Sequence, residues 1–242
     1  MIKLSFSDQT LNFIGQLKER KMRKKYQERI NLETARILLN IGAINFNIST
    51  PYKLASGILS PTYVDCRKII SEPKSRSKVI DFFQEIFLKE LKNEKIENIA
   101  GGETAGIPFA ALLADRLNLP LCYVRKKPKG YGKNSQIEGR IKYNQNILLV
   151  EDLATDGGSK INFVNALRKG SAKCNNVFVL FYYNIFDSTR KLLSDNSINL
   201  HYLTTWHDIL SYAKKENLFD MKTLTEVDNF LSNPTLWSEQ RS

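Results

Sequence analysis

Short apolar runs alternate with longer amphipathic segments through the middle of the chain. Amphipathic segments at 106–118 and 158–170 predict helices, the second closed by Gly170. Apolar runs predict strands around them at 96–102, 121–127, 146–150 and 176–184, with an edge strand at 198–203. Strands joined through helices run parallel and are covered on both faces. The expected fold class is therefore α/β, a central parallel sheet flanked by helices.

The pattern is different before this region, in residues 1–72. A helical segment is expected first, and Asn31 is expected to cap a helix with Leu32, Ala35, Leu38 and Leu39 on one side. Short β-prone pieces then follow, broken by proline and glycine. They predict a small antiparallel hairpin, or hood, outside the parallel sheet.

A helix beginning at Pro73 carries a stripe of apolar residues and opens the α/β core, which is expected to extend over 73–210. Residues 211–242 are charged and helical in pattern and form a C-terminal helical tail. The last of them, 233–242, are expected to be loose.

The charge of the chain suits anionic partners. Its 242 residues include 36 Lys and Arg against 25 Asp and Glu, which gives a net charge of +11. Most lysines are spread along the sequence, and the only dense basic run, 18–29, predicts one solvated helix. Binding to nucleic acid would require a concentrated basic stripe with aromatic residues, so it is not expected.

Cysteine and histidine usage indicates a cytoplasmic protein without a metal site of its own. Cys66, Cys122 and Cys174 are far apart and odd in number, which is typical of a reducing compartment and argues against disulfides or a cysteine zinc site. His201 and His207 lack the spacing of a helical metal pair. No secretory leader and no apolar stretch of membrane-spanning length is evident, so no membrane is expected.

The segment 147–159, ILLVEDLATDGGS, combines a strand, two acids and a glycine turn. The apolar run reads as a buried strand, and the glycines and the following helix start can direct N–H groups at a phosphate. Neither a P-loop lysine nor a dinucleotide-binding glycine motif is present. Glu151 and Asp152 would repel that phosphate unless they face sugar hydroxyls, magnesium or a developing cation.

Three segments together resemble the orotate phosphoribosyltransferases. They are SGILSPTYVDCRK, GGETAGIPFAALLADRLNLPLCYVRKKPKGYGKNSQIEG and LLVEDLATDGGS, within roughly residues 30–210. The resemblance implies the type I phosphoribosyltransferase fold, a homodimer and magnesium as cofactor. It also implies transfer of the phosphoribosyl group of phosphoribosyl pyrophosphate (PRPP) to orotate, which gives orotidine 5′-monophosphate and pyrophosphate in pyrimidine biosynthesis.

The resemblance implies roles around PRPP. Glu151 and Asp152 would hold the ribose hydroxyls and are expected to be catalytic together with Lys129, which would meet the pyrophosphate. Magnesium would be held mainly by PRPP, without a dedicated protein site. The PRPP-binding residues expected are Arg125, Lys126, Lys129, Tyr131, Thr104, Ala105, Glu151, Asp152, Leu153, Ala154, Thr155, Asp156, Gly157, Gly158 and Ser159.

Orotate would lie under the hood formed by 56–64. Backbone groups of Tyr63 and Val64 would face the ring, and Thr155 would hydrogen-bond it. The glycine- and lysine-rich loop up to Gly139 would close over the site, often that of the partner subunit. Because the orotate nitrogen is acidic enough to react as an anion, no strong protein base is expected.

Four positions depart from relatives. Ala55 and Ala105 stand where some have lysine, and Tyr131 stands where a histidine is common. Asp156 adds a carboxylate near the 5′-phosphate, so its side chain is expected to point away or to cap the next helix. Two other interpretations stay open: a phosphoribosyltransferase for another base, and a non-catalytic PRPP sensor that binds nucleic acid.

Overall fold

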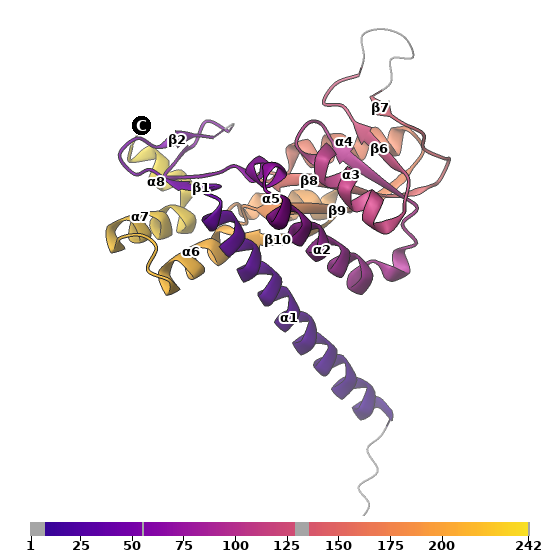
Figure 1. The fold of residues 1–242 in the computed structure, drawn as a ribbon, viewed down its shortest axis with the longest axis horizontal. Coiled ribbons are helices and arrows are strands. Elements are labelled where there is room, and N and C mark those ends of the chain that lie inside the picture. The colour runs from indigo at the N-terminus through magenta and orange to yellow at the C-terminus, as the bar shows by residue number, and fades with distance from the viewer. Residues whose placement is uncertain (1–7, 55, 129–135, 242) are drawn as a thin grey trace, which may run out of the picture.

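The computed structural model describes residues 8–54, 56–128 and 136–241, with side chains from residue 21 onward. Its main sheet consists of β5 (Asn98–Gly102), β6 (Leu121–Val124), β7 (Ile137–Glu138), β8 (Asn146–Ala154), β9 (Lys173–Tyr182) and β10 (Asn199–Thr205). The strand order is β10-β9-β8-β5-β6-β7, and helices surround the sheet (Figure 1). All neighbours pair in parallel except β7, which is antiparallel to β6. The predicted α/β fold is confirmed, with one antiparallel strand added at the edge.

Helices cover both faces of this sheet. They are α1 (Asp8–Asn40), α2 (Pro73–Glu90), α3 (Gly106–Leu117), α4 (Gly158–Lys169), α5 (Asp187–Asp195), α6 (Trp206–Lys215), α7 (Met221–Ser232) and α8 (Pro234–Glu239), with 3₁₀ turns at Cys66–Ser71 and Lys92–Glu94. One face packs against α1, α2, α3 and α6, and the other against α4 and α5. In the described ranges, no helix combines the length and the apolar character needed to cross a bilayer.

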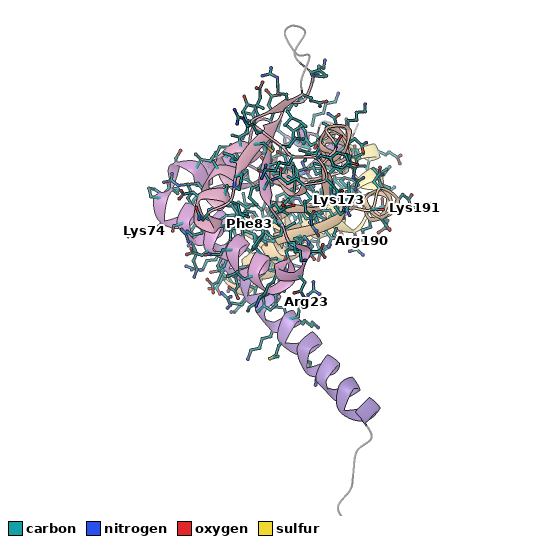
Figure 2. All side chains as sticks on the ribbon, turned by 90° about the vertical axis from the view of Figure 1, so that its right-hand side faces the viewer. Arg23, Lys74, Phe83, Lys173, Arg190 and Lys191 are labelled. Atoms are coloured by element: carbon teal, nitrogen blue, oxygen red, sulfur yellow. The ribbon has the colours of Figure 1, made fainter. Side chains whose placement is uncertain are left out.

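The central strands are apolar on both sides, as expected for a buried parallel sheet. In β8, Leu148 and Val150 point into one core, while Ile147 and Leu149 point into the other. The stripe predicted on α2 lies against the first of these cores. Its Phe83, labelled in Figure 2, stacks on Phe178 of β9 with ring centroids 5.3 Å apart.

Helix α1 is one continuous helix, so the prediction that Asn31 caps a second helix is wrong. The side chain of Asn31 instead accepts a hydrogen bond from Gln27 at 2.7 Å and donates one to Asp208 of α6 at 3.2 Å. Leu32, predicted on the apolar side, is 41% exposed. The helix leaves the body of the protein near Arg23 (Figures 1 and 2).

The predicted hood is confirmed as two small antiparallel pairs. β1 (Ile44–Phe46) pairs with β4 (Thr62–Val64), and β2 (Tyr52–Lys53) pairs with β3 (Leu59–Ser60). Strands this short are not stable alone, so the hood depends on packing against its surroundings.

The prediction of a loose C-terminus is wrong, because 234–239 form α8 against the hood. Trp237 is 3% exposed and packs edge-on against Phe230 of α7 with centroids 5.6 Å apart. Asn233 caps the helix by accepting the N–H of Leu236 at 3.1 Å. One buried tryptophan and a cap thus order the segment.

Candidate active site

A cavity of about 880 Å³ opens where β5, β8 and β9 end beneath the hood. The hood, the loop after β5, the turn from β8 into α4 and the segment after β9 all contribute to its wall. In α/β proteins, ligands bind beyond the carboxyl ends of parallel strands. The structure therefore brings three of the sequence segments singled out above to one place.

The turn between β8 and α4 has the backbone of an anion cradle. Gly157 has a φ of +83°, in the left-handed region that favours glycine, and α4 begins at the next residue. Thr155, Asp156 and Ser159 line the cavity. The N-terminal end of α4, with its free N–H groups and positive dipole end, is therefore at the cavity wall.

Asp156 stabilises this turn but does not supply the expected side-chain cap of α4, because Gly157 is the N-cap residue. Its Oδ1 accepts the N–H of Gly158 at 3.1 Å, and its side chain is exposed. Thr189 of α5 donates a hydrogen bond to the Thr155 carbonyl at 3.1 Å, which holds the turn from the other side. The carboxylate thus stabilises the backbone of the cradle.

Glu151 and Asp152 lie within β8, which continues to Ala154 instead of ending at Val150 as predicted. Glu151 is 5% exposed and its Oε2 lies 2.9 Å from Nζ of Lys160. Asp152 is only partly buried, and its Oδ1 accepts the N–H of Leu153 at 2.8 Å. The adjacent carboxylates therefore have different surroundings.

Burial raises the pKa of both carboxyls above their ordinary values. For Glu151, the Lys160 ammonium opposes this rise in pKa, while the Asp152 charge adds to it. For Asp152, Lys160 and the Leu153 N–H oppose the rise in pKa. Two acids held this closely in a cavity are typical of a functional site.

The loop after β5 presents Glu103, Thr104 and Ala105 to the cavity. Glu103 Oε2 accepts the N–H of Lys126 at 2.7 Å, which ties this loop to the end of β6. The Glu103–Thr104 peptide bond is cis. Thr104 and Ala105, both expected to bind PRPP, thus line the cavity.

The predicted cations do not all lie at the cavity. Lys126 is part of its wall, but Arg125 is not among the lining residues, and its guanidinium is 3.9 Å from Glu138 of β7. Lys129 and Tyr131, together with Ala55 of the hood, fall outside the described residues.

The hood contributes Tyr63 and Val64 to the wall, and Thr155 lies in the same cavity. Arg67, which sequence reasoning did not single out, also lines it. Its Nε lies 2.6 Å from Asp65 Oδ1, and it donates a hydrogen bond to the Tyr63 hydroxyl at 3.2 Å. This contact fixes one side of the hood.

Sequence reasoning also missed Lys53, Lys160, Tyr183 and Phe186, all in the cavity wall. Lys160 directly follows the glycine turn, so its place in the first turn of α4 was a usable signal. Tyr183 and Phe186 follow β9, and the rule that ligands bind at strand ends could have found them. Lys53 had no comparable signal.

Metal-binding side chains do not form a cage in the described part of the chain. No three His, Cys, Asp or Glu side chains there are grouped closely enough to hold an ion. The three cysteines are free and buried.

Comparisons with known proteins identify related sequences. The phosphoribosyl transferase domain family matches residues 67–196. Orotate phosphoribosyltransferase of Ruegeria sp. (strain TM1040) is 54% identical over 212 residues, covering 88% of this chain and 94% of that protein. The Roseobacter denitrificans enzyme of the same name is 53% identical over 206 residues, covering 85% and 92%.

Solved structures share the fold. Orotate phosphoribosyltransferase from Aeropyrum pernix aligns with a TM-score of 0.64 and 28% identity, over 77% of this chain and 99% of that one. Leishmania donovani UMP synthase aligns with a TM-score of 0.70 and 24% identity, over 83% of this chain and 42% of that one, a likeness of fold alone. With half-identical relatives matched over most of their length, the chain belongs to the orotate phosphoribosyltransferase family.

Proposed function

We propose that the 880 Å³ cavity is the site at which this protein transfers the phosphoribosyl group of PRPP to orotate, releasing pyrophosphate. The observation that carries this proposal is that the acidic pair, the cradle of α4, the 103–105 loop and the hood all line one cavity. Each of these four parts suits one part of the two substrates.

The cradle and the acidic pair suit the ribose 5-phosphate half of PRPP. We place the 5′-phosphate at 155–159, because the end of α4 offers N–H groups and a positive dipole end there. Asp152, partly exposed in the wall, would accept hydrogen bonds from the ribose hydroxyls. As pyrophosphate departs, the ribose becomes cationic, and fixed carboxylates stabilise that charge.

The pyrophosphate half would lie against the 103–105 loop and Lys126. The backbone N–H of Lys126 is bound by Glu103, so the main chain that carries this cation is held at the cavity wall. Lys129 is proposed to add a second cation for the leaving group, on the sequence resemblance alone. Arg125 is the weaker candidate, since its guanidinium is near Glu138.

Orotate would bind beneath the hood, against Tyr63 and Val64 and within reach of Thr155. Its acidic ring nitrogen attacks the anomeric carbon as the bond to pyrophosphate breaks. The nitrogen lone pair forms the new C–N bond, and the electron pair of the broken C–O bond leaves on pyrophosphate. Neither described histidine lines the cavity, and an anionic nucleophile does not need a strong base.

The donor set of the cavity fits magnesium bound through the substrate. Mg²⁺ prefers oxygen ligands and commonly combines phosphates and water with one or two carboxylates. Glu103 and Asp152 are wall residues that could supply such an oxygen. The ion would neutralise charge on the pyrophosphate.

We further propose a cytoplasmic homodimer in which the loop up to Gly139 is shared between subunits. The sequence resemblance supports the dimer, and three free, buried cysteines suit a reducing compartment.

One assay tests the proposed function. Purified protein is mixed with PRPP, magnesium and orotate, and the loss of orotate absorbance is followed, with uracil and adenine as alternative bases. Turnover with orotate, abolished by chelating magnesium, is expected. Turnover only with another base would overturn the substrate assignment, and no turnover with any base would overturn catalysis.

A further inference from the structure

Lys160 is a buried lysine in the first turn of α4 for which the proposed reaction has no assigned role. It is 4% exposed, although it borders the cavity. Its Nζ donates to Glu151 Oε2 at 2.9 Å and to Ser159 Oγ at 3.0 Å. Burying an ammonium is costly unless it is paired and hydrogen-bonded, so its place depends on Glu151.

The partner carboxylate is confined as tightly as the lysine. A Cβ built on Gly102, at the end of β5, would lie 2.4 Å from Glu151 Oε1. A Cβ on Gly106, the first residue of α3, would lie 2.5 Å from the same oxygen. The carboxylate therefore occupies the space that side chains at both glycines would need.

Two helix N-termini stabilise the negative charge of this carboxylate. Gly106 starts α3 and Lys160 belongs to the first turn of α4, so the carboxylate lies beside the positive ends of two helix dipoles. Glu151 Oε1 has no hydrogen-bond partner among the described residues. Lys160 is therefore the group that holds this side chain through a direct bond.

Both acids interact with the charge of Lys160, but their other charged neighbours differ. The charge of Asp152 acts on Cys66 and Arg67, next to the hood. That of Glu151 interacts with Lys160 and Lys126, on the side of α4. The carboxylate of Glu151 is anchored at the junction of β5, α3 and α4. This anchor restrains the backbone of β8 next to Asp152, which lines the cavity.

We propose that Lys160 is a positioning residue that anchors Glu151 and thereby holds Asp152 in place to meet the ribose of PRPP. This rests on the proposed function. A direct contact of Lys160 with the 5′-phosphate is disfavoured, because two of its three N–H donors are used inside the protein and its side chain is almost wholly buried.

A double-mutant cycle tests the proposal. Lys160→Met removes the charge at similar length, Glu151→Gln keeps an acceptor for the lysine, and the double variant carries a neutral pair. Lys169→Met, an exposed lysine in the last turn of the same helix, is the matched control. Steady-state kinetics, the KM for each substrate, thermal unfolding and the affinity for inorganic phosphate are measured for all variants.

If Lys160 acts through Glu151, Lys160→Met should lower kcat/KM for PRPP about 10–100-fold, the usual effect of losing a group that orients a functional ligand. The KM for orotate and the affinity for inorganic phosphate should stay within about 3-fold, because in this proposal Lys160 contacts neither ligand. A 3-fold change corresponds to about 0.7 kcal/mol of binding free energy. The double variant should be no slower than Glu151→Gln alone, since residues that act as a unit are not additive.

Three outcomes would overturn the proposal. One is a double variant at least about tenfold slower than Glu151→Gln, because losses that multiply come from independent sites. The second is a loss of phosphate affinity by the same factor as PRPP, which would make Lys160 a phosphate ligand. The third is an unchanged kcat/KM in Lys160→Met.

Lys160→Met leaves an unpaired buried carboxylate, which destabilises the folded protein. The comparison of the double variant with Glu151→Gln does not need that protein, so it can overturn the proposal even if Lys160→Met does not fold. Failure of the proposed function would be seen earlier and separately, as wild-type protein that does not turn over orotate.

Discussion

The hydroxyl of Ser238 accepts the backbone N–H of Leu59 at 2.9 Å, joining the last helix of the chain to the hood. The two residues are 179 positions apart in sequence. Leu59 belongs to β3, whose hairpin with β2 covers one side of the cavity through residues such as Lys53 and Ile58. The C-terminus thus supports the part of the protein proposed to hold orotate.

Ser238→Ala should therefore weaken orotate binding more than PRPP binding. Removing the acceptor leaves the Leu59 N–H unpaired, which costs about 1–2 kcal/mol. The KM for orotate should rise about 3–10-fold, or about 0.7–1.4 kcal/mol, with the KM for PRPP unchanged. Ser232→Ala, in α7, is the control. Equal rises in the KM for orotate and the KM for PRPP would contradict a selective role of α8 in orotate binding.

Gly106→Ala should damage the fold. A Cβ there would lie 2.4 Å from the Val150 carbonyl and 2.5 Å from Glu151 Oε1. Overpacking against fixed backbone costs about 1–3 kcal/mol or more. Gly158→Ala is the contrast, because its nearest neighbour would be Asp156 Oδ1 at 3.7 Å. Urea unfolding should show a large loss only for Gly106→Ala, and equal stabilities would contradict the packing described.

Asp152→Asn should raise the thermal stability of the protein and lower its activity. Burial raises the pKa of Asp152, so the folded protein binds this proton more tightly than the unfolded chain does. At pH values above the raised pKa the ionised form costs stability. The variant should have a higher Tm at pH 8, with the gain shrinking as the pH falls toward about 4.

The same substitution should reduce kcat/KM about 10²-fold or more, the usual loss when a fixed charge facing the transition state is removed. Asp115→Asn, exposed on α3, is the control for both Tm and kinetics. Full activity in Asp152→Asn would mean that this carboxylate does not face the ribose.

Glu90, at the end of α2, should carry an acid-dependent part of the stability. Burial opposes its ionisation, but hydrogen bonds from His201, Tyr26 and Arg23 outweigh burial and lower its pKa to about 2. Because this pKa lies below the ordinary value of 4.5, the stabilisation is complete above about pH 4.5 and is lost toward about pH 2.

Glu90→Gln should lower stability at pH 7 by about 1–3 kcal/mol, the range for hydrogen bonds to charged groups. The difference from wild type in urea midpoint should stay constant down to about pH 5 and narrow below it. Glu94→Gln, exposed nearby, serves as the reference. A difference that is the same at pH 3.5 and pH 7 would contradict the lowered pKa.

Lys129→Ala tests the cation proposed for pyrophosphate. Loss of a charge that stabilises the leaving group should reduce kcat by about 10²–10³-fold. The Tm should not change, while Lys142→Ala, an exposed lysine, should leave both quantities unchanged. An unaltered kcat would remove Lys129 from the mechanism.

The sequence alone determined the α/β class, the segment 147–159 and most strands and helices of 96–184, but neither β7 nor α5. Apolar periodicity is local, and parallel strands must be buried on both faces, so runs such as 146–150 leave little choice of structure. The acidic pair, the cradle and the 103–105 loop line one cavity, in agreement with the rule that ligands lie at the carboxyl ends of parallel strands.

Tertiary structure decided what depends on distant partners. Asn31 lies within a helix, and its side chain donates a hydrogen bond to Asp208 of α6. Helix α8 packs against the rest of the protein through buried Trp237 and through Ser238, which accepts the N–H of Leu59. Arg125 is beside Glu138 through the pairing of β6 with β7.

The bond between Lys160 and Glu151 required the geometry of a strand end meeting a helix start, within space left by Gly102 and Gly106. Periodicity reports which way a residue faces along its own element. It does not report which side chain from another element will be within 3 Å, because that depends on how the elements pack.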